Sequence, residues 1–384
     1  MIKTAVILAG GKGERMMPVT NSQPKALVPI NGVPILKLQI NQLVKNGVSK
    51  IYVLTGHLGE QILDYTNTLN LGSKVTCINS DPNFTPGERL IKSLSLVKED
   101  FLLLYCDNYI PDDEVIKKQL NASIGVTLLL HKRELGNINI KDNFLAVYTG
   151  NERIPKNPYV ELGFIAVRSV EFANALYRLR EINLVLEELS RLNEIHFNLL
   201  TENYFSLSDF NKYVDQNLHG NVIILDRDGI INAKMEKRKY LTSFENLQYI
   251  EKNIEIFSML SNKGFNFIVA TNQPGIATKE VSELFLANVH QKITNDLRKL
   301  SINILTFYVC KHHWDDLCEC RKPKPGMLNQ AIKDFNLERN NLIFIGDENS
   351  DLRAAEAAGI NGIKFSSNDS KFNLSQVSMQ TKVI

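Results

Sequence analysis

The sequence predicts an α/β protein that consists of two doubly wound domains. Apolar runs typical of buried strands alternate with helical segments in two successive series, which is the pattern of mostly parallel sheets with helices on both faces. The length of 384 residues allows two domains, each large enough to bury its own core. Acidic residues and glycines follow several of these runs, at the strand ends where open α/β sheets build their sites.

The first strand–helix series occupies the N-terminal half of the chain. Strands are expected at Lys3–Leu8, Ile51–Leu54, Val75–Ile78 and Phe101–Tyr105, and helices at Pro34–Asn46, Gly59–Tyr65 and Glu88–Val97. Prolines and a glycine at the boundaries mark the turns. The segment Glu171–Leu192 is also expected to be helical.

The second series follows the polar stretch Phe210–Gly220. Its strands are expected at Asn221–Leu225, Phe265–Ala270 and Leu342–Ile345. We therefore predict a first domain at residues 1–215, a linker at 216–220 and a second domain at 221–384. The polar tail after Phe365 is expected to be mobile.

Composition excludes several classes of protein. A net charge of +2 gives no support for nucleic-acid or membrane binding. No apolar stretch approaches the roughly 18–20 residues of a membrane-spanning helix, and no signal peptide is recognisable, so we expect a cytoplasmic protein. Three of the five cysteines lie close together, which favours a metal site over a disulfide framework. The sequence does not indicate an oligomeric state.

The second series carries acidic, hydroxyl and basic residues after its strands. Asp226 and Asp228 follow the first strand, Thr271 follows the second, Lys322 comes later and Asp347 follows the third. A carboxylate nucleophile can form an aspartyl-phosphate, and a second carboxylate can act as general acid and base. A hydroxyl and a lysine can hold phosphoryl oxygens where negative charge develops. We therefore predict phosphoryl-transfer chemistry, with Asp226 as nucleophile and Asp228 as acid and base.

This arrangement resembles that of the haloacid-dehalogenase (HAD) phosphatases, over about residues 220–366. The resemblance implies a Rossmann-like fold and a Mg²⁺ ion at the strand ends. The expected Mg²⁺ ligands are Asp226, the backbone carbonyl of Asp228 and Asp347, with Asp351 or Glu348 supporting through water.

A dense cysteine and histidine cluster precedes Lys322. Three thiolates and one imidazole within eleven residues match a closed, structural zinc site. His313 could compete for the metal, although the Cys-x-His spacing favours its neighbour. The expected zinc ligands are Cys310, His312, Cys318 and Cys320.

The zinc loop runs directly into Arg321-Lys322-Pro323, as in the heptose-1,7-bisphosphate phosphatases and the related histidinol-phosphate phosphatases, which this loop resembles. Both lack a large cap domain, so the loop is expected to shape the substrate entrance. Arg321 is expected to clamp a second anionic group of the substrate, and Asn272 to orient the loop or the substrate. The short loop between His312 and Cys318 is more similar to the histidinol branch, whereas Pro325-Gly326-Met327 is more similar to the heptose branch.

The N-terminal half has a glycine-rich turn after its first strand. Gly10, Gly11 and Gly13 let backbone N–H groups approach phosphate oxygens, because no Cβ atom stands in the way. Arg15 and Lys25 would add positive charge against a triphosphate. The turn and the Pro-Lys pair together predict a nucleotide-binding site.

This pairing resembles that of the sugar-1-phosphate nucleotidyltransferases, over about residues 1–210. The resemblance implies that Asp107 holds Mg²⁺ and that Gly163 lies against the sugar. Ser206 stands near the position of a second metal-binding aspartate, so Asp209 takes its place or the domain is catalytically silent. The Glu-Lys-Pro segment that supplies a lysine for the sugar phosphate is missing, and Lys156 is a candidate replacement.

The fusion of the two domains decides between the branches. Removing the 7-phosphate from D-glycero-D-manno-heptose 1,7-bisphosphate leaves a heptose 1-phosphate, which belongs to the substrate class of the N-terminal domain. We therefore predict a bifunctional enzyme of nucleotide-activated heptose synthesis, with a sugar phosphate and GTP as substrates and Mg²⁺ and structural Zn²⁺ as cofactors. The alternative is a histidinol-phosphate or other sugar-phosphate phosphatase with a silent nucleotidyltransferase-like binding domain.

Overall fold

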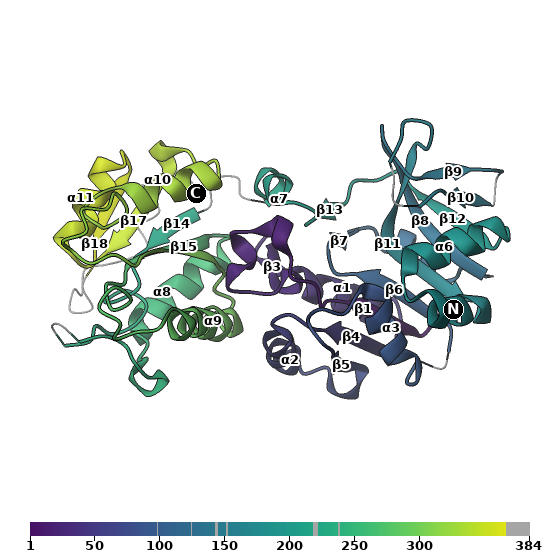
Figure 1. Cartoon of the computed structure of the whole chain (residues 1–384), viewed down its shortest axis with the longest axis horizontal. Coiled ribbons are helices and arrows are strands. Elements are labelled where there is room, and N and C mark those ends of the chain that lie inside the picture. Colours follow the sequence, from purple (N-terminus) through teal and green to yellow (C-terminus); the bar gives the residue numbers. More distant parts are fainter. Residues whose placement is uncertain are drawn as a thin grey trace. The chain divides into compact units, whose positions relative to one another are not determined.

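The computed structural model describes residues 1–97, 99–123, 125–142, 145–150, 153–217, 222–236 and 239–365. The chain divides into two compact units (Figure 1): Met1–Met16 with Pro24–Asp209, and Met17–Gln23 with Phe210–Ile384. The predicted mobile tail after Phe365 lies outside the described residues, as do residues 218–220 of the predicted linker.

The first unit contains a mixed sheet. Its main path runs β10-β9-β11-β6-β1-β4-β5, and β8 joins β11 to β12. The strands are β1 (Thr4–Leu8), β2 (Pro29–Ile30), β3 (Val33–Pro34), β4 (Lys50–Thr55), β5 (Val75–Asn79), β6 (Phe101–Tyr105), β7 (Asn108–Tyr109), β8 (Gly125–Lys132), β9 (Ile138–Ile140), β10 (Ala146–Tyr148), β11 (Tyr159–Arg168), β12 (Ile195–Leu200) and β13 (Phe205–Ser206). The helices are α1 (Ile35–Lys45), α2 (Gly59–Thr68), α3 (Pro86–Leu94), α4 (Asp113–Leu120), α5 (Val170–Leu179) and α6 (Ile182–Arg191), with 3₁₀ turns η1 (Glu14–Met16), η3 (Lys25–Leu27) and η4 (Gly72–Lys74).

Both faces of this sheet are covered by helices. In β1, Ala5 and Ile7 belong to one apolar cluster, and the alternate residues Val6 and Leu8 belong to another. The first cluster includes side chains of α1, α2 and α4, and the second includes side chains of α3, α5 and α6. Because successive strand residues point to opposite faces, this pattern buries the central strands on both sides and confirms the doubly wound prediction.

The structure corrects one expectation for the first unit and adds detail to another. Strand β11 runs antiparallel to β6 and β8, so the sheet is mixed beyond β6. The segment Glu171–Leu192 is helical as expected, and it forms two helices, α5 and α6, because Arg180 adopts a left-handed conformation (φ 59°) that ends α5. A non-glycine residue at positive φ is uncommon, and no proline or glycine marks this break in the sequence.

The second unit contains a parallel sheet in the order β16-β15-β14-β17-β18, with β14 at its centre. The strands are β14 (Val222–Leu225), β15 (Asn266–Asn272), β16 (Ile304–Cys310), β17 (Ile343–Gly346) and β18 (Asn361–Lys364). The helices are α7 (Phe210–Asn217), α8 (Glu251–Asn262), α9 (Glu283–Lys299), α10 (Gly326–Asp334) and α11 (Asn349–Ala357), with 3₁₀ turns η2 (Val19–Asn21), η5 (Phe244–Asn246) and η6 (Arg339–Asn341). The C-terminal ends of these strands form one edge, where parallel sheets place their sites.

Two segments next to the sequence-based domain limits belong to the second unit. Helix α7 covers residues of the expected linker region, and the ring of its Phe210 lies 4.9 Å from that of Phe335. The short segment Met17–Gln23 also belongs to this unit. Gln23 Oε1 accepts a hydrogen bond from Arg298 Nη2 at 2.7 Å. The domain limits proposed from the sequence remain a prediction.

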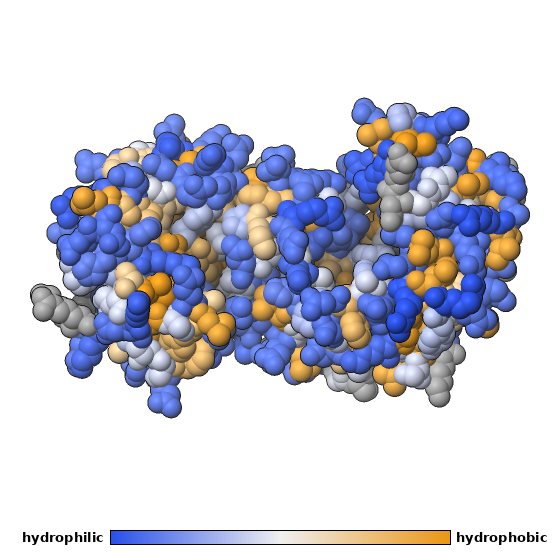
Figure 2. Space-filling view, in the orientation of Figure 1, coloured by the Kyte–Doolittle hydropathy of each residue, from blue (hydrophilic) through white to orange (hydrophobic). Residues whose placement is uncertain are grey.

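The visible surface is dominated by hydrophilic residues, and apolar residues occur singly or in small groups (Figure 2). Such scattered apolar residues are ordinary on a protein surface. Among the described residues, no helix combines the length and the apolar character needed to cross a membrane.

Candidate active sites and metal cluster

The strand-end site of the second unit is organised around a buried lysine. The ammonium group of Lys322 lies 2.8 Å from Asp226 Oδ1 and 2.8 Å from Asp351 Oδ1, and it donates a hydrogen bond to the carbonyl of Ala270 at 2.9 Å. Burial disfavours the charged lysine, but the two carboxylates outweigh burial and raise the pKa of Lys322. The lysine therefore remains cationic beside the predicted nucleophile.

Three carboxylates gather at this lysine. Asp226, Asp347 and Asp351 offer oxygen atoms that lie within 4.8 Å of one another. Burial raises the pKa of Asp226 in spite of the opposing charge of Lys322, and burial likewise raises the pKa of Asp347. Asp347 Oδ1 is buried and has no hydrogen-bond partner among the described residues. Such a set of hard oxygen ligands fits a divalent cation, which would favour the ionised carboxylates.

The two candidate supporting acids behave differently. Asp351 is 1% exposed and belongs to the carboxylate cluster, where it also accepts a hydrogen bond from the backbone N–H of Glu348 at 2.9 Å. Glu348 instead pairs with Lys234, whose ammonium group lies 2.5 Å from Glu348 Oε1 and 2.7 Å from Asp347 Oδ2. The structure therefore brings Asp351, rather than Glu348, to the predicted metal position.

Gly229 allows the loop after β14 to approach Asp347. Its φ is +89°, and a Cβ atom at this position would lie 2.5 Å from Asp347 Oδ2. Any side chain would therefore collide with the carboxylate and strain the backbone. The glycine of the Asp-Arg-Asp-Gly motif is explained by this close approach.

Asp228 is held in a hydrogen-bond network. Arg227 Nη2 lies 2.8 Å from both carboxylate oxygens of Asp228, and the amides of Asn232 and Gln273 donate to these oxygens at 2.9 and 2.7 Å. Gln273 Nε2 also lies 2.8 Å from Thr271 Oγ1. Burial opposes ionisation, but these donors outweigh it and lower the pKa of Asp228. The predicted acid and base is thus a carboxylate in this state.

A buried histidine supports the network, and the sequence alone did not point to it. His290 stacks on Phe307 with ring centres 4.1 Å apart, and its Nε2 lies 3.4 Å from Arg227 Nη1. Burial and the charge of Arg227 hold the pKa of His290 well below its ordinary value. The neutral ring can therefore accept from the guanidinium. His290 lies within α9, away from the strand-end motifs, so only its packing reveals this contact.

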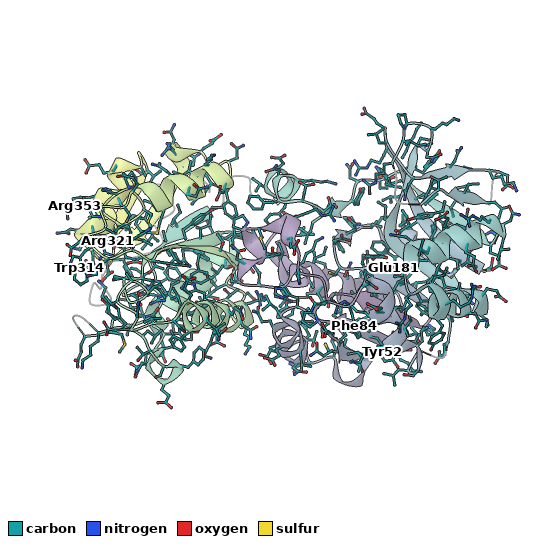
Figure 3. The ribbon with its side chains drawn as sticks, in the orientation of Figure 1. Tyr52, Phe84, Glu181, Trp314, Arg321 and Arg353 are labelled. Carbon is teal, nitrogen blue, oxygen red and sulfur yellow. The ribbon has the colours of Figure 1, made fainter. Side chains whose placement is uncertain are left out.

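The remaining predicted residues of this site lie around Lys322. Asn272 exchanges two hydrogen bonds with the backbone of Lys322, both at 3.1 Å, and so orients the loop that carries the lysine. Arg321 belongs to the same loop, between β16 and α10, as does Trp314 (Figure 3). Arg321 Nη1 is buried without a hydrogen-bond partner among the described residues. An unpaired guanidinium nitrogen next to the site is available for an anionic group.

The cysteine and histidine cluster forms a compact set of potential metal ligands. The sulfur atoms of Cys310 and Cys320 lie 3.7 and 3.6 Å from that of Cys318, and His312 Nδ1 lies 3.2 Å from Cys320 Sγ. Tetrahedral zinc–sulfur bonds of about 2.3 Å place sulfur atoms roughly 3.8 Å apart. The observed spacing matches that geometry. His313 is not part of the set, and its ring packs on Trp314 instead.

In the first unit, Lys25 and Asp107 come together although they are far apart in the sequence. Lys25 Nζ lies 3.1 Å from Asp107 Oδ2 at the C-terminal end of β6. Gly10, Gly11, Gly13 and Arg15 lie in the loop and turn after β1, which is parallel to β6. The predicted nucleotide residues and the predicted metal carboxylate therefore share one edge of the sheet.

The segment with Ser206 lies beside Asp107, as its sequence position suggested. Strand β13 pairs with β7, so that Ser206 is opposite Asn108, and the N–H of Leu207 donates to the carbonyl of Asp107 at 2.7 Å. Ser206 therefore occupies the neighbourhood of the predicted metal carboxylate. Asp209 follows as the last residue of the first unit.

A second carboxylate near Asp107 was not predicted. Asn108 Nδ2, next to Asp107, donates to the carbonyl of Leu162 at 2.9 Å, and the charge of Asp107 contributes to the raised pKa of Glu161, the neighbour of Leu162. Glu161 accepts hydrogen bonds from the backbone N–H groups of Gly163 and Phe164, yet burial raises its pKa to about 7. Gly163 has a φ of +76°, and a Cβ atom there would lie 2.8 Å from Tyr105 Cβ. The glycine expected at the sugar thus also permits the irregularity of β11 next to Glu161.

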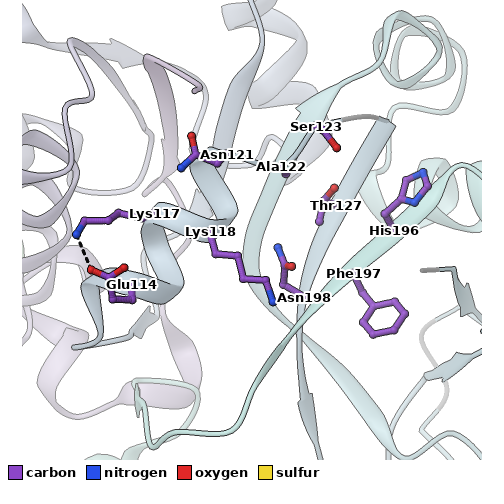
Figure 4. A pocket seen from close by; sticks show the side chains of 10 residues that line it. All are labelled: Glu114, Lys117, Lys118, Asn121, Ala122, Ser123, Thr127, His196, Phe197 and Asn198. Atoms are coloured by element: carbon purple, nitrogen blue, oxygen red, sulfur yellow. Dashed lines mark hydrogen bonds and ion pairs between the residues drawn. The ribbon is translucent and has the colours of Figure 1, made fainter. Parts of the chain in front are cut away.

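A cavity of about 600 Å³ lies elsewhere in the first unit, between the C-terminal half of α4 and β12. Lys117, Lys118, His196 and Asn198 line it, and Lys117 is paired with Glu114 at 2.5 Å (Figure 4). None of the predicted site residues lines this cavity. The size of this cavity therefore does not identify a catalytic site, since the predicted site residues lie at the strand ends.

Comparison with known proteins assigns a class to each unit. Residues 5–135 match the family model of the MobA-like NTP transferase domain, and residues 221–381 match that of polynucleotide kinase 3 phosphatase. A putative glucose-1-phosphate thymidylyltransferase from Bacillus anthracis has a similar structure, with a TM-score of 0.49 and 20% identity, over 57% of this chain and 94% of that one. The two family matches show that the chain joins an NTP-transferase-like domain to a phosphatase-like domain.

Curated relatives define the second class further. The D-glycero-α-D-manno-heptose-1,7-bisphosphate 7-phosphatase of Photorhabdus laumondii is 37% identical over 146 residues, which are 36% of this chain and 78% of the relative. The histidine biosynthesis bifunctional protein HisB of Campylobacter jejuni is 28% identical over 144 residues, which are 38% of this chain and 41% of that relative. The chain belongs to the family of the heptose-1,7-bisphosphate 7-phosphatases.

Proposed function

We propose that the chain is a bifunctional enzyme of nucleotide-activated heptose synthesis. Its second unit removes the 7-phosphate of D-glycero-D-manno-heptose 1,7-bisphosphate, and its first unit transfers a nucleotidyl group, GMP from GTP, to the heptose 1-phosphate. The observation that carries the proposal is the buried Lys322, which joins Asp226 to Asp351 at the end of β14. The family of the second unit supports the choice of substrate.

The first chemical step is attack by a carboxylate oxygen of Asp226 on the phosphorus atom. A bond forms between phosphorus and the attacking oxygen of Asp226. The bond between phosphorus and the oxygen on C7 of the sugar breaks. Lys322 and Thr271 bind the equatorial oxygens, where negative charge builds up. Asp228 delivers a proton to the leaving alkoxide, and it must first take up that proton because Arg227 holds it ionised.

The second step regenerates the enzyme. Asp228, now a carboxylate again, removes a proton from water, and the resulting hydroxide oxygen bonds to phosphorus while the bond to Asp226 breaks. Asn232 and Gln273 keep Asp228 in place through both steps. Splitting the hydrolysis into two displacements lowers the barrier of a very slow reaction.

Two metal ions belong to the proposal. The cluster of Asp226, Asp347 and Asp351 suits Mg²⁺, which supplies charge compensation for the phosphoryl group when it is bound. The backbone carbonyl of Asp228 remains an expected additional ligand. The Cys310–Cys320 cluster suits a structural Zn²⁺, which would fix the loop that carries Arg321 and Lys322. That loop then places Arg321 for the second phosphate of the substrate.

For the first unit, the glycine-rich turn with Arg15 and Lys25 would bind the triphosphate. Asp107 would hold Mg²⁺, which would supply charge compensation for the phosphate groups when bound, and Gly163 would lie against the sugar. The NTP-transferase domain match and the ion pair between Lys25 and Asp107 support this assignment. GTP as the donor and the cytoplasm as the location remain predictions from the sequence.

An assay that reads both products tests the proposal. Purified full-length protein receives heptose 1,7-bisphosphate, Mg²⁺ and one of the four NTPs, and phosphate and pyrophosphate are measured separately. We expect both products, with pyrophosphate release fastest with GTP. The absence of phosphate release from the bisphosphate, together with rapid hydrolysis of histidinol phosphate, would refute the heptose assignment.

A second candidate is a phosphatase with a silent nucleotidyltransferase-like domain that only binds a nucleotide sugar. The location of Ser206 beside Asn108, where a second metal carboxylate was expected, favours this candidate. Phosphate release without pyrophosphate for any NTP would support it. Glu161, a carboxylate close to Asp107, favours the active enzyme instead.

A further inference from the structure

Arg133, His131 and Tyr204 form a basic and aromatic cluster at the strand ends of the first unit. In the order of the strands, this cluster lies on the side of Asp107 away from the glycine-rich turn. Arg133 directly follows β8, and its N–H donates to the carbonyl of Pro158 at 2.8 Å. The end of β8 pairs with the start of β11, where His131 is opposite Val160. Glu161 is the next residue of β11. Arg133 therefore belongs to the sheet edge that carries Glu161 and Asp107.

Tyr204 holds the Arg133 side chain at this edge. Arg133 Nη2 donates a hydrogen bond to the hydroxyl of Tyr204, and its guanidinium carbon lies 5.5 Å from the centre of the ring. The ring of His131 packs edge-on against Tyr204 with centres 5.2 Å apart, and His131 Nδ1 donates to the carbonyl of Leu200 at 3.2 Å. Arg133 is thus an exposed arginine whose head group is fixed by aromatic neighbours.

Tyr204 also connects Arg133 to the predicted metal position. It immediately precedes β13, whose Ser206 is paired with Asn108. Two independent connections, through β8–β11 and through Tyr204–β13, therefore place Arg133 at the same sheet edge as Asp107. Among the residues that the structure describes, no carboxylate forms an ion pair with Arg133. Within the described part of the chain, the bond to Tyr204 occupies one of the five guanidinium N–H groups and leaves four for a ligand.

We propose that Arg133, positioned by Tyr204, binds the phosphate of the sugar 1-phosphate that accepts the nucleotide. This inference rests on the proposed transferase function and assigns its acceptor subsite. The Glu-Lys-Pro segment that would supply a lysine for the sugar phosphate is missing from this chain. In this proposal Arg133, and not Lys156, supplies the cation. A planar guanidinium with free donors matches a phosphate group better than a single ammonium does.

The strand order separates this subsite from that of the triphosphate. Arg15 and Lys25 belong to the loops after β1, whereas Arg133 follows β8, and the strands between them are β6 and β11. Three strand spacings of about 4.8 Å put β8 roughly 14 Å from β1. Asp107, at the end of β6, lies between the two groups. The acceptor phosphate would thus approach from one side and the α-phosphate of the nucleotide from the other.

The test compares variants of the full-length protein that carry Asp226→Asn, so that phosphatase activity does not interfere. Pyrophosphate release is measured against heptose 1-phosphate and against GTP. Arg133→Met should raise the KM for heptose 1-phosphate about 10- to 100-fold, the effect of one charged hydrogen-bonding group, and leave the KM for GTP within about twofold. Arg133→Lys should recover part of the loss, and Tyr204→Phe should cause a smaller rise.

Lys156→Met is the matched control, because Lys156 is an exposed cation in the adjoining turn before β11. We expect this variant to behave like the parent. A rise in the KM for heptose 1-phosphate in Lys156→Met but not in Arg133→Met would overturn the assignment, as would equal rises for both substrates in Arg133→Met. A parent protein without pyrophosphate release would contradict the proposed function itself. Binding of heptose 1-phosphate to the parent and to Arg133→Met, measured by calorimetry, then tests the subsite separately. Equal affinities for the two proteins would refute the proposed role of Arg133.

Discussion

Replacing Glu161 by glutamine should stabilise the first unit, and the gain should depend on pH. Burial, with a contribution from the charge of Asp107, raises the pKa of Glu161 from the ordinary 4.5 to about 7 in spite of the hydrogen bonds from Gly163 and Phe164. Glutamine has nearly the same shape and keeps an oxygen acceptor for those N–H groups. The substitution therefore removes the charge with little change in packing.

The sign and size of the effect follow from proton linkage. Between pH 4.5 and about 7 the folded unit keeps the Glu161 proton while the unfolded chain loses it, so the free energy of unfolding falls as pH rises. The penalty is absent below pH 4.5 and complete above about pH 7. It amounts to about 3 kcal/mol, at about 1.4 kcal/mol for each pH unit between the two pKa values. For a unit of this size that corresponds to roughly 6–12 °C in Tm.

The assay is thermal unfolding at pH 5 and pH 8.5, followed by far-UV circular dichroism. The difference in Tm between Glu161→Gln and the parent should be several degrees larger at pH 8.5 than at pH 5. Glu60→Gln, an exposed change in α2, should give the same small difference at both pH values. The only tryptophan, Trp314, lies in the second unit, so its fluorescence transition should not move. A Tm difference that is independent of pH would refute the reasoning about Glu161.

Three further predictions concern the second unit. Asp226→Asn should abolish phosphate release and leave pyrophosphate release within about twofold, because Asp226 belongs to the second unit and the predicted transferase residues belong to the first; retained hydrolysis would disprove the nucleophile. Cys318→Ser should lower the bound zinc measured by mass spectrometry, and an unchanged zinc content would remove the metal hypothesis. Gln23→Ala removes the acceptor of Arg298 and should destabilise the second unit by about 1–3 kcal/mol in urea, read from Trp314 fluorescence. An unchanged urea midpoint would contradict the role of Gln23.

The strand-end residues could be predicted because their signal is local. Asp226, Thr271 and Asp347 each follow an apolar run, and the C-terminal ends of parallel strands meet at one edge. His290 has no such signal, since a histidine within a helix acquires a role only through what packs against it, here Phe307 and Arg227. For a related reason, the sequence does not mark the break between α5 and α6. Arg180 ends α5 in a left-handed conformation, and no glycine or proline stands at this break.

The sequence by itself determined the phosphoryl-transfer set of the second unit, the four-residue cysteine and histidine cluster, and the glycine-rich turn with Lys25. These motifs are short, and their spacing limits where their side chains can lie. Only the tertiary structure decided that the charge of Asp107 acts on Glu161, that Tyr204 holds Arg133, and which carboxylates form ion pairs with Lys322. Antiparallel register, burial and the resulting ionisation depend on residues distant in the chain, and a single sequence does not reveal which of them will meet.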